Sequence, residues 1–403
     1  MNLVFVIDQY SDLNNGTTAT ARRTAQHLIE RGHHVEILAA NLDNDNQNAL
    51  PNESFDMTDI DAQIETVDIP FFQTLIEEQG FAFAKVADQA IYKQAFKSAD
   101  LVHFFIPSPF CKAGVNVARE LHIPVSTAFH MQPKNITYSI GMGKNKPANN
   151  MIYRFLKRYF YNDFNFIHCP SHMVADELVK HGYEADLRVI SNGVAEFFHP
   201  LDKAEIHTDL LKKIDLTKKE KPIILLSVGR LSGEKRLDIL IDAIKYSKYR
   251  NQIYVVIGGQ GPKEKVLKKL AKQEGVNIQF GFYEQADLRQ LYNLCDLYIH
   301  PADAETEGIS CMEAITCGAV PIIADSPYSA TKEFALTEHS LFEAGDSKAL
   351  AKQIDYWLDN PNEQIKFKQA YTKYGETLAI NNIISEFEKF FQDAIEYQSV
   401  HKN

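Results

Sequence analysis

Short apolar runs alternate with amphipathic helical segments along this chain, and the alternation restarts half-way. The first half has apolar runs at 2–7, 34–40, 101–105, 124–129, 164–169 and 187–193, and the second half has them at 222–229, 253–259, 277–282, 296–301 and 320–325. Continuous apolar runs are typical of buried parallel strands, and strands that alternate with helices form βαβ units. The pattern predicts an α/β protein with two Rossmann-like, doubly wound domains facing a central cleft.

The segment "NGVAEFFHPLDKAE" separates the two series and is interpreted as a linker. We therefore predict an N-terminal domain over 1–195 and a C-terminal domain over 196–379. The tail at about 380–398 places isoleucine and phenylalanine side chains on one helical face. In doubly wound domains, ligands bind outside the carboxyl ends of the strands, so the cleft is the expected binding site.

Composition excludes several classes of protein. A length of 403 residues with 45% hydrophobic residues is enough for two cores. The net charge of -11 argues against general nucleic-acid binding. The five cysteines have no C-x-x-C spacing, which predicts buried free thiols. No run approaches the ~20 apolar residues of a membrane span, and we expect a cytoplasmic protein.

The stretch "AETEGISCMEA" (304–314) predicts a strand-to-helix turn that binds a phosphate. A helix beginning near Gly308 leaves the amides of Ile309 and Ser310 without intrahelical partners at the positive end of the helix dipole. Glu305 and Glu313 lie on either side, and ionised carboxylates accept hydrogen bonds from sugar or ribose hydroxyls. Alternatively, the glutamates only favour a helix start and face solvent.

Two further loops follow strands in the same half. "SVGRLSGEKRLD" contains Gly229, Arg230 and Lys235, and we expect a helix from about Glu234. Two cations near one strand end can hold a diphosphate as it leaves. Ordinary surface charge is the alternative for this mixed run. "IGGQGP" adds a glycine-rich turn around Gly259, which by itself is a weak signal.

Together, "VGRLSGEKRLD", "IGGQGP", the E-x7-E motif "ETEGISCME" and "GAVPIIAD" resemble the retaining GT-B glycosyltransferases of family 4 (glycosyl transferases group 1). The resemblance covers nearly the whole chain and implies that the C-terminal helix packs back onto the first domain. Two positions depart from the family: the first-domain loop has Asn15-Gly16 where two glycines are usual, and "SPYSATKEFA" follows "PIIAD" where a glycine-rich loop is common.

The resemblance implies a role for each candidate residue. Arg230 and Lys235 would hold the donor diphosphate, and the Ile309 and Ser310 amides would meet phosphate. Glu313 would bind the ribose and Glu305 the transferred sugar. Gly16 in "NNGTT" would approach the anomeric carbon, and His130 in "AFHMQP" would reach the donor sugar, unless it is a satisfied interior histidine.

The function that the resemblance implies is transfer of a hexose, with retention and without a protein nucleophile, from a nucleotide-diphosphate sugar to a lipid or cell-surface glycan. UDP and glucose follow from frequency in the family. No cofactor or metal is expected, since the "DND" at 43–45 is interpreted as a turn. A nucleotide-sugar epimerase and a non-catalytic nucleotide-sugar-binding protein are the alternatives.

The segment 143–166 combines five basic residues and one acidic residue with several aromatic side chains. Basic and aromatic groups on one helix can lie on an anionic membrane surface, so we predict a peripheral contact with the inner face of the membrane. The alternative is a half-buried helix that packs its aromatic side chains inward. The basic run at 210–222 is interpreted as a solvated linker.

Overall fold

A computed structural model describes residues 1–10, 16–40, 64–67, 82–139, 142–143, 145–202, 205–206 and 222–401. The chain divides into two compact units. Unit 1 contains Met1–Asn192 and Ile380–Asn403, and unit 2 contains Gly193–Ala379. The predicted boundary after residue 195 lies close to the first of these two crossings.

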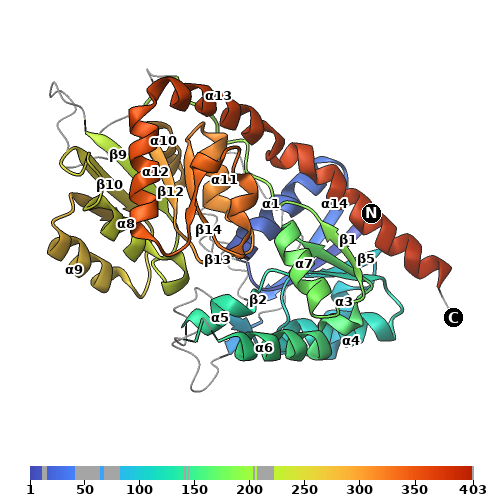
Figure 1. The fold of residues 1–403 in the computed structure, drawn as a ribbon. Coiled ribbons are helices and arrows are strands. Elements are labelled where there is room, and N and C mark those ends of the chain that lie inside the picture. Colours follow the sequence, from blue (N-terminus) through green and yellow to red (C-terminus); the bar gives the residue numbers. More distant parts are fainter. Residues whose placement is uncertain are drawn as a thin grey trace. The chain divides into compact units, whose positions relative to one another are not determined.

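Unit 1 is built on a six-stranded parallel sheet (Figure 1). The strands lie in the order β2 (His34–Ala40), β1 (Asn2–Gln9), β5 (Leu101–Phe104), β6 (Val125–Ala128), β7 (Phe166–Cys169) and β8 (Asp186–Val189). A small antiparallel pair, β3 (Thr66–Val67) and β4 (Phe83–Ala84), lies outside this sheet. The central strands are almost fully buried, as their continuous apolar runs predict.

The helices of unit 1 connect these strands and cover the sheet. They are α1 (Gly16–Glu30), α3 (Gln89–Ala95), α4 (Pro109–Glu120), α5 (Pro133–Ser139), α6 (Lys146–Tyr159), the 3-10 helix η2 (Tyr161–Asp163), α7 (His172–Lys180) and α14 (Ile380–Val400). Helix α14 packs beside α1 and over β5 and β6 (Figure 1). Its buried face carries Phe387, Phe390 and Phe391.

Unit 2 repeats the architecture with a second six-stranded parallel sheet. Its strands lie in the order β11 (Ile278–Gly281), β10 (Ile253–Gly258), β9 (Ile223–Val228), β12 (Leu297–His300), β14 (Pro321–Asp325) and β16 (Leu341–Glu343). A two-stranded parallel pair joins β13 (Ala304–Glu305) to β15 (Tyr328–Ser329). The prediction of two Rossmann-like domains is confirmed.

Unit 2 contains both α-helices and short 3-10 helices. They are η3 (Gly233–Lys235), α8 (Leu237–Ile244), α9 (Glu264–Glu274), α10 (Gln285–Leu294), α11 (Ile309–Thr316), η4 (Ala330–Phe334), η5 (Glu338–Ser340), α12 (Ser347–Asp359) and α13 (Pro361–Thr377). The helix expected from about Glu234 begins instead at Leu237, because Arg236 adopts a left-handed backbone with φ 50° and ends the short η3 turn.

All five cysteines are free and buried. Among the helices of the described residues, none combines the length and the apolar character that crossing a bilayer requires.

Candidate active site

The strand order of unit 2 brings the predicted site residues together. From β9 the chain proceeds through β10 to β11 on one side, then returns to β12 on the other side of β9. The loops after β9 and β12 are therefore neighbours at the carboxyl edge of the sheet, which is the usual ligand position in this architecture. Arg230 and Lys235 lie in the first loop, and Glu305 lies in the second.

An ion pair joins these two loops. The Lys235 ammonium donates to Glu305 Oε2 at 2.5 Å, and a Cβ atom added at Gly229 would lie 3.8 Å from Lys235 Cε. Burial alone would raise the pKa of the Glu305 carboxyl, yet Lys235, with smaller contributions from His300 and Arg230, holds that pKa below its usual value. Glu305 is therefore an anion in a partly buried, positively charged setting.

Arg230 is held at the base of the same loop. Its guanidinium donates to Glu234 Oε1 at 3.0 Å, and Glu234 is only 2% exposed. The hydroxyl of Ser232 donates to the same carboxylate. The main-chain oxygen of Glu234 accepts from the amide of Asp303 in the loop after β12 at 2.8 Å. The two loops are thus bonded through both backbone and side chains.

The start of helix α11 has the geometry that the sequence predicts. Gly308 is the N-cap residue and has φ 95°, and a Cβ atom there would lie 2.2 Å from the Thr331 methyl group. Only glycine fits such a position without strain. In the described part of the chain, the amides of Ile309 and Ser310 have no hydrogen-bond partner. They are therefore available to an anion.

Glu313 is placed one turn into α11. Its Oε2 accepts from the Tyr292 hydroxyl of α10 at 2.9 Å. Tyr292 is fully buried in the core, so this bond fixes the carboxylate relative to the sheet. A carboxylate held in this way can accept from the two hydroxyls of a ribose.

Gly259 has a structural role that the sequence did not reveal. It has φ 139°, and a Cβ atom there would lie 2.1 Å from the main-chain oxygen of Gly229. The turns after β9, β10 and β11 are bonded side by side, with Gly229 N donating to Gly258 O and Gly259 N donating to Gly281 O. Gly259 therefore allows the close backbone approach that sets the Gly229–Arg230 turn.

In unit 1, the carboxyl end of β6 leads to His130. Its ring is stacked 6.0 Å from Phe105 and lies 5.5 Å from the His168 ring, centroid to centroid. Nε2 is buried and has no hydrogen-bond partner among the described residues. Burial lowers the pKa of the His130 imidazole to about 3, with a further contribution from His168. His130 is therefore neutral at physiological pH.

Gly16 is the exposed first residue of α1. Its preceding loop and the "DND" segment lie outside the described residues. At the end of β1, Asp8 is fully buried and accepts from the Ser108 hydroxyl at 2.6 Å and from the Ala84 amide at 2.9 Å. Burial raises the pKa of the Asp8 carboxyl to about 6. These bonds tie β4 and the N-cap of α4 to β1.

Sequence reasoning missed three features of unit 2. His300 and Tyr298 at the end of β12 belong to the same hydrogen-bonded group as Ser310. Within "SPYSATKEFA", Tyr328–Ser329 forms β15, which pairs with β13 and so positions Glu305. The sequence did contain a signal for His300, because it is a polar residue at the end of an otherwise apolar strand and so lies where ligands bind in this architecture.

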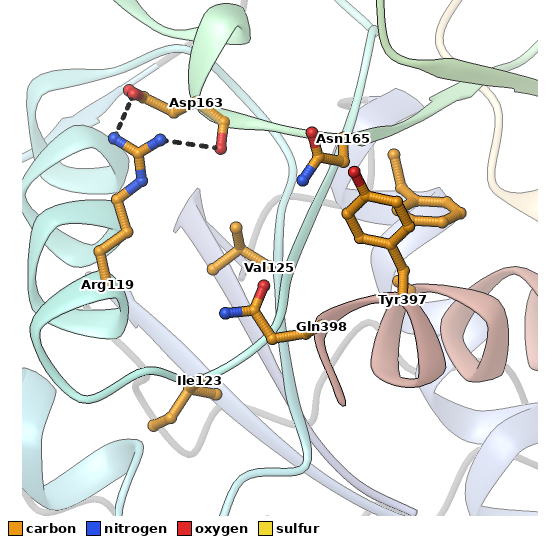
Figure 2. Close-up of a pocket in the computed structure, with 9 residues that line it drawn as sticks. Arg119, Ile123, Val125, Asp163, Asn165, Tyr397 and Gln398 are labelled. Atoms are coloured by element: carbon orange, nitrogen blue, oxygen red, sulfur yellow. Dashed lines mark hydrogen bonds and ion pairs between the residues drawn. The ribbon is translucent and has the colours of Figure 1, made fainter. Parts of the chain in front are cut away.

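Unit 1 contains a hollow of about 240 Å³ (Figure 2). Its lining includes Val125 and Phe166, which are the first residues of β6 and β7, so it opens at the amino edge of the sheet. Arg119 at its rim is already paired with Asp163 at 2.6 Å. The hollow therefore lies at the amino edge of the sheet, whereas His130 lies at the carboxyl edge.

No cluster of three or more histidine, cysteine, aspartate or glutamate side chains suited to a metal ion occurs among the described residues.

Two family models match the chain in succession. The model for Glycosyltransferase Family 4 matches residues 14–196, and the model for Glycosyl transferases group 1 matches residues 211–375. The chain is a family 4 glycosyltransferase. The second match spans the loops with Arg230, Lys235, Glu305 and Glu313, whose geometry is described above.

Similar proteins agree with this assignment. The glycosyltransferase is 27% identical over 346 residues to an alpha-monoglucosyldiacylglycerol synthase from Streptococcus pneumoniae, covering 81% of this chain and 72% of that one. It is 23% identical over 329 residues to an alpha-monoglucosyldiacylglycerol synthase from Acholeplasma laidlawii, covering 76% and 81%. The enzyme is a hexosyltransferase.

The fold is GT-B. The structure of Anabaena HepE in complex with UDP-glucose resembles that of this glycosyltransferase with a TM-score of 0.70 and 17% identity, over 99% of this chain and 100% of that chain.

Proposed function

We propose that this glycosyltransferase moves a hexose, with glucose as the first candidate, from a UDP-linked donor to a membrane lipid with retention of configuration. The observation that supports the donor most directly is the group at the carboxyl edge of unit 2. There the Lys235–Glu305 ion pair, Arg230 and the first amides of α11, which have no partner among the described residues, lie in the neighbouring loops that follow β9 and β12.

The chemistry of this group matches a nucleotide sugar. Two cations and a helix N-terminus suit a diphosphate, because its charge increases as the bond to the sugar breaks. Glu305 is the acceptor for hydroxyls of the hexose, and Glu313, fixed by Tyr292, is the acceptor for the ribose. For unit 1, the family resemblance alone supports Gly16 and His130 as proposed donor contacts.

Transfer on one face of the sugar needs no protein nucleophile. The bond between the anomeric carbon and the diphosphate oxygen breaks, and the acceptor hydroxyl oxygen forms the new bond on the same face. The proton of that hydroxyl passes to the departing diphosphate. The protein's contribution is to position the reactants and to stabilise the leaving group.

The acceptor is proposed from two independent observations. Both relatives named above are diacylglycerol-glucosylating enzymes by their names. In addition, α6 carries four basic residues and no acidic one, and exposes Met151 (66%) and Phe155 (60%) between them. Tyr153, Phe160 and Tyr161 are buried, so only part of the aromatic set is available to a partner. An exposed apolar pair flanked by cations suits the interface of an anionic bilayer on its cytoplasmic side.

The reaction is tested by incubating the protein with UDP-glucose, with and without diacylglycerol vesicles. We expect UDP release that depends on the acceptor, and an α-linked glucolipid detected by mass spectrometry and NMR. A β-linked product would contradict retention. Interconversion of the donor without acceptor would indicate an epimerase, and binding without turnover would indicate a sensor.

Membrane docking is tested by co-sedimentation with anionic and neutral vesicles. We expect preferential binding to anionic vesicles, and a loss of at least tenfold in the double variant Met151→Ser, Phe155→Ser. Val179→Ser is the matched control, since Val179 is 63% exposed on α7 of the same unit. Equal sedimentation of all three proteins would contradict docking through α6.

A further inference from the structure

The last residue of β12 is a buried histidine with an unused ring nitrogen. His300 is 2% exposed, and its Nε2 has no hydrogen-bond partner among the residues that the structure describes. Leaving a buried polar atom unpaired costs free energy, so native proteins contain few of them and each requires an explanation.

The other ring nitrogen faces a chain of hydroxyl groups. The Ser310 hydroxyl donates to the main-chain oxygen of Val228 at 2.9 Å, and the Tyr298 hydroxyl lies 3.0 Å from Ser310 Oγ. His300 Nδ1 lies 3.5 Å from the Tyr298 oxygen. The single Tyr298 proton has nearer acceptors in Ser310 Oγ at 3.0 Å and Val228 O at 3.3 Å than in Nδ1 at 3.5 Å, so we assign it to one of these two oxygens and assign the ring proton to Nδ1. Nε2 then carries the lone pair and acts as an acceptor.

The position of Nε2 is beside the proposed donor site. An ideal Cβ at Gly308 would lie 3.7 Å from His300 Nε2 and 3.3 Å from Glu305 Cγ. The Thr331 methyl group fills that place, 2.2 Å from the ideal Cβ position, and His300 Nε2 and Glu305 lie near one another beside Gly308 and this methyl group. Burial lowers the pKa of the His300 imidazole to about 4, so the ring is neutral at physiological pH.

A neutral acceptor cannot bind a phosphate oxygen, which has no proton to give at this pH. It requires a hydroxyl or an amide donor. The neighbouring Glu305 is likewise an acceptor, so the two side chains together present acceptor atoms to a ligand with adjacent hydroxyls. In a nucleotide sugar, both the ribose and the transferred sugar are linked to the diphosphate and have adjacent hydroxyls. Because Glu313 is the proposed acceptor for the ribose, we assign His300 and Glu305 to the transferred sugar.

We propose that His300 Nε2 accepts a hydrogen bond from a hydroxyl of the donor sugar and is a specificity-determining residue of this glycosyltransferase. The inference rests on the proposed function. In the ligand-free structure the Lys235 ammonium is bonded to Glu305. When the diphosphate binds, it takes over the Lys235 ammonium and frees the Glu305 carboxylate for the sugar.

The test measures UDP and UDP-glucose binding by calorimetry in His300→Phe and His300→Gln. The phenylalanine variant keeps the ring but has no acceptor, so we expect UDP-glucose affinity to fall about tenfold, while UDP affinity changes less than twofold. The glutamine variant keeps a polar atom near Nε2, and we expect it to recover most of the lost affinity. The ligand-free His300→Phe protein should be at least as thermally stable as the wild type.

His339→Phe and His339→Gln are the controls, because His339 lies in the same unit and stacks 3.6 Å from Tyr356. Unchanged UDP-glucose affinity in His300→Phe would overturn the inference, since Nε2 would then be served by a buried water only. An equal loss for UDP and UDP-glucose would also overturn it and indicate a structural role. If the wild type binds none of UDP-glucose, UDP-galactose, UDP-N-acetylglucosamine and GDP-mannose, the proposed function fails, and the inference fails with it.

Discussion

At the scale of single residues, the two cations of the β9 loop have the clearest consequence. Replacing Lys235 or Arg230 by alanine removes a preorganised partner of the leaving diphosphate, which typically costs about 3 kcal/mol of barrier. We expect glucosyl transfer to fall roughly a hundredfold or more in either variant. Steady-state rates with UDP-glucose and lipid acceptor provide the measurement.

Lys248→Ala is the matched control for this prediction. Lys248 is exposed in the same unit and pairs with Asp359, away from the β9 and β12 loops. Its loss should leave turnover unchanged. If both single variants, Lys235→Ala and Arg230→Ala, kept near-normal rates, neither side chain would stabilise the leaving group as proposed.

Gly308 allows a second prediction at this scale. Gly308→Ala adds a Cβ at 2.2 Å from the Thr331 methyl group in a left-handed backbone, whereas Gly275→Ala, with φ 65°, adds one in open space. Both variants incur the backbone strain of about 1 kcal/mol, but only the first also has a steric clash. Denaturant unfolding should show a clearly larger loss of stability for Gly308→Ala. Equal losses would mean that the start of α11 moves aside freely.

At the scale of elements, helix α14 covers a buried group of histidines in unit 1. The ring centroids of His103 and Phe391 are 5.3 Å apart, and those of His168 and Phe387 are 4.8 Å apart. His168 Nε2 is bonded to Ile190 O at 2.7 Å. Burial lowers the pKa of His168 to about 4 and that of His103 well below its ordinary value. The fold therefore holds these rings neutral.

The pH dependence of stability follows from these shifts. In the unfolded chain an imidazole titrates near pH 6.5, so between about pH 6.5 and 4 the unfolded state binds more protons than the folded state. The contribution of the histidines is complete above pH 6.5 and is lost as the pH falls toward 4. Asp8, with its pKa raised to about 6, opposes this trend as a single group. We expect the Tm of unit 1 to fall by roughly 5 °C or more between pH 7.5 and 5.

Circular dichroism melts at several pH values measure this effect, and His168→Gln should reduce the slope, since glutamine can still donate to Ile190 O but does not titrate. A Tm that is constant over this range would show that the buried rings do not control acid stability.

The element scale also separates what the sequence could predict from what it could not. Most strands of the two sheets were predictable because they lie in short apolar runs, and the start of α11 was predictable from Gly308 and its flanking carboxylates. Strand β16 and the two-residue strands β3, β4, β13 and β15 were not predicted, because such short segments carry no periodic signal. The start of α8 was not, because Arg236 takes a left-handed conformation that is rare for arginine and is held by bonds to Asp238 and Asp303. The roles of His300 and Gly259 depend on contacts between loops, which local sequence does not encode.

At the scale of the whole molecule, the proposed chemistry uses positive charge from side chains and a helix terminus. We therefore expect transfer to proceed at an unchanged rate after treatment with EDTA. The measurement is the rate of UDP release from chelator-treated, gel-filtered enzyme with and without added Mg²⁺ or Mn²⁺. A strict requirement for either ion would contradict leaving-group stabilisation by Arg230, Lys235 and α11 alone.

The chain crosses from unit 1 to unit 2 near residue 192 and returns near residue 380. During synthesis, the sheet of unit 1 is translated before its covering helix α14, which is complete only when the ribosome has passed residue 400. The later-made unit has all of its strands and helices in one uninterrupted stretch, and so it can finish folding first. An N-terminal fragment that stops before α14 would expose to chaperones the face of its sheet that carries Phe5 and Phe166, which contact Phe391 and Phe390 of α14 in the folded protein.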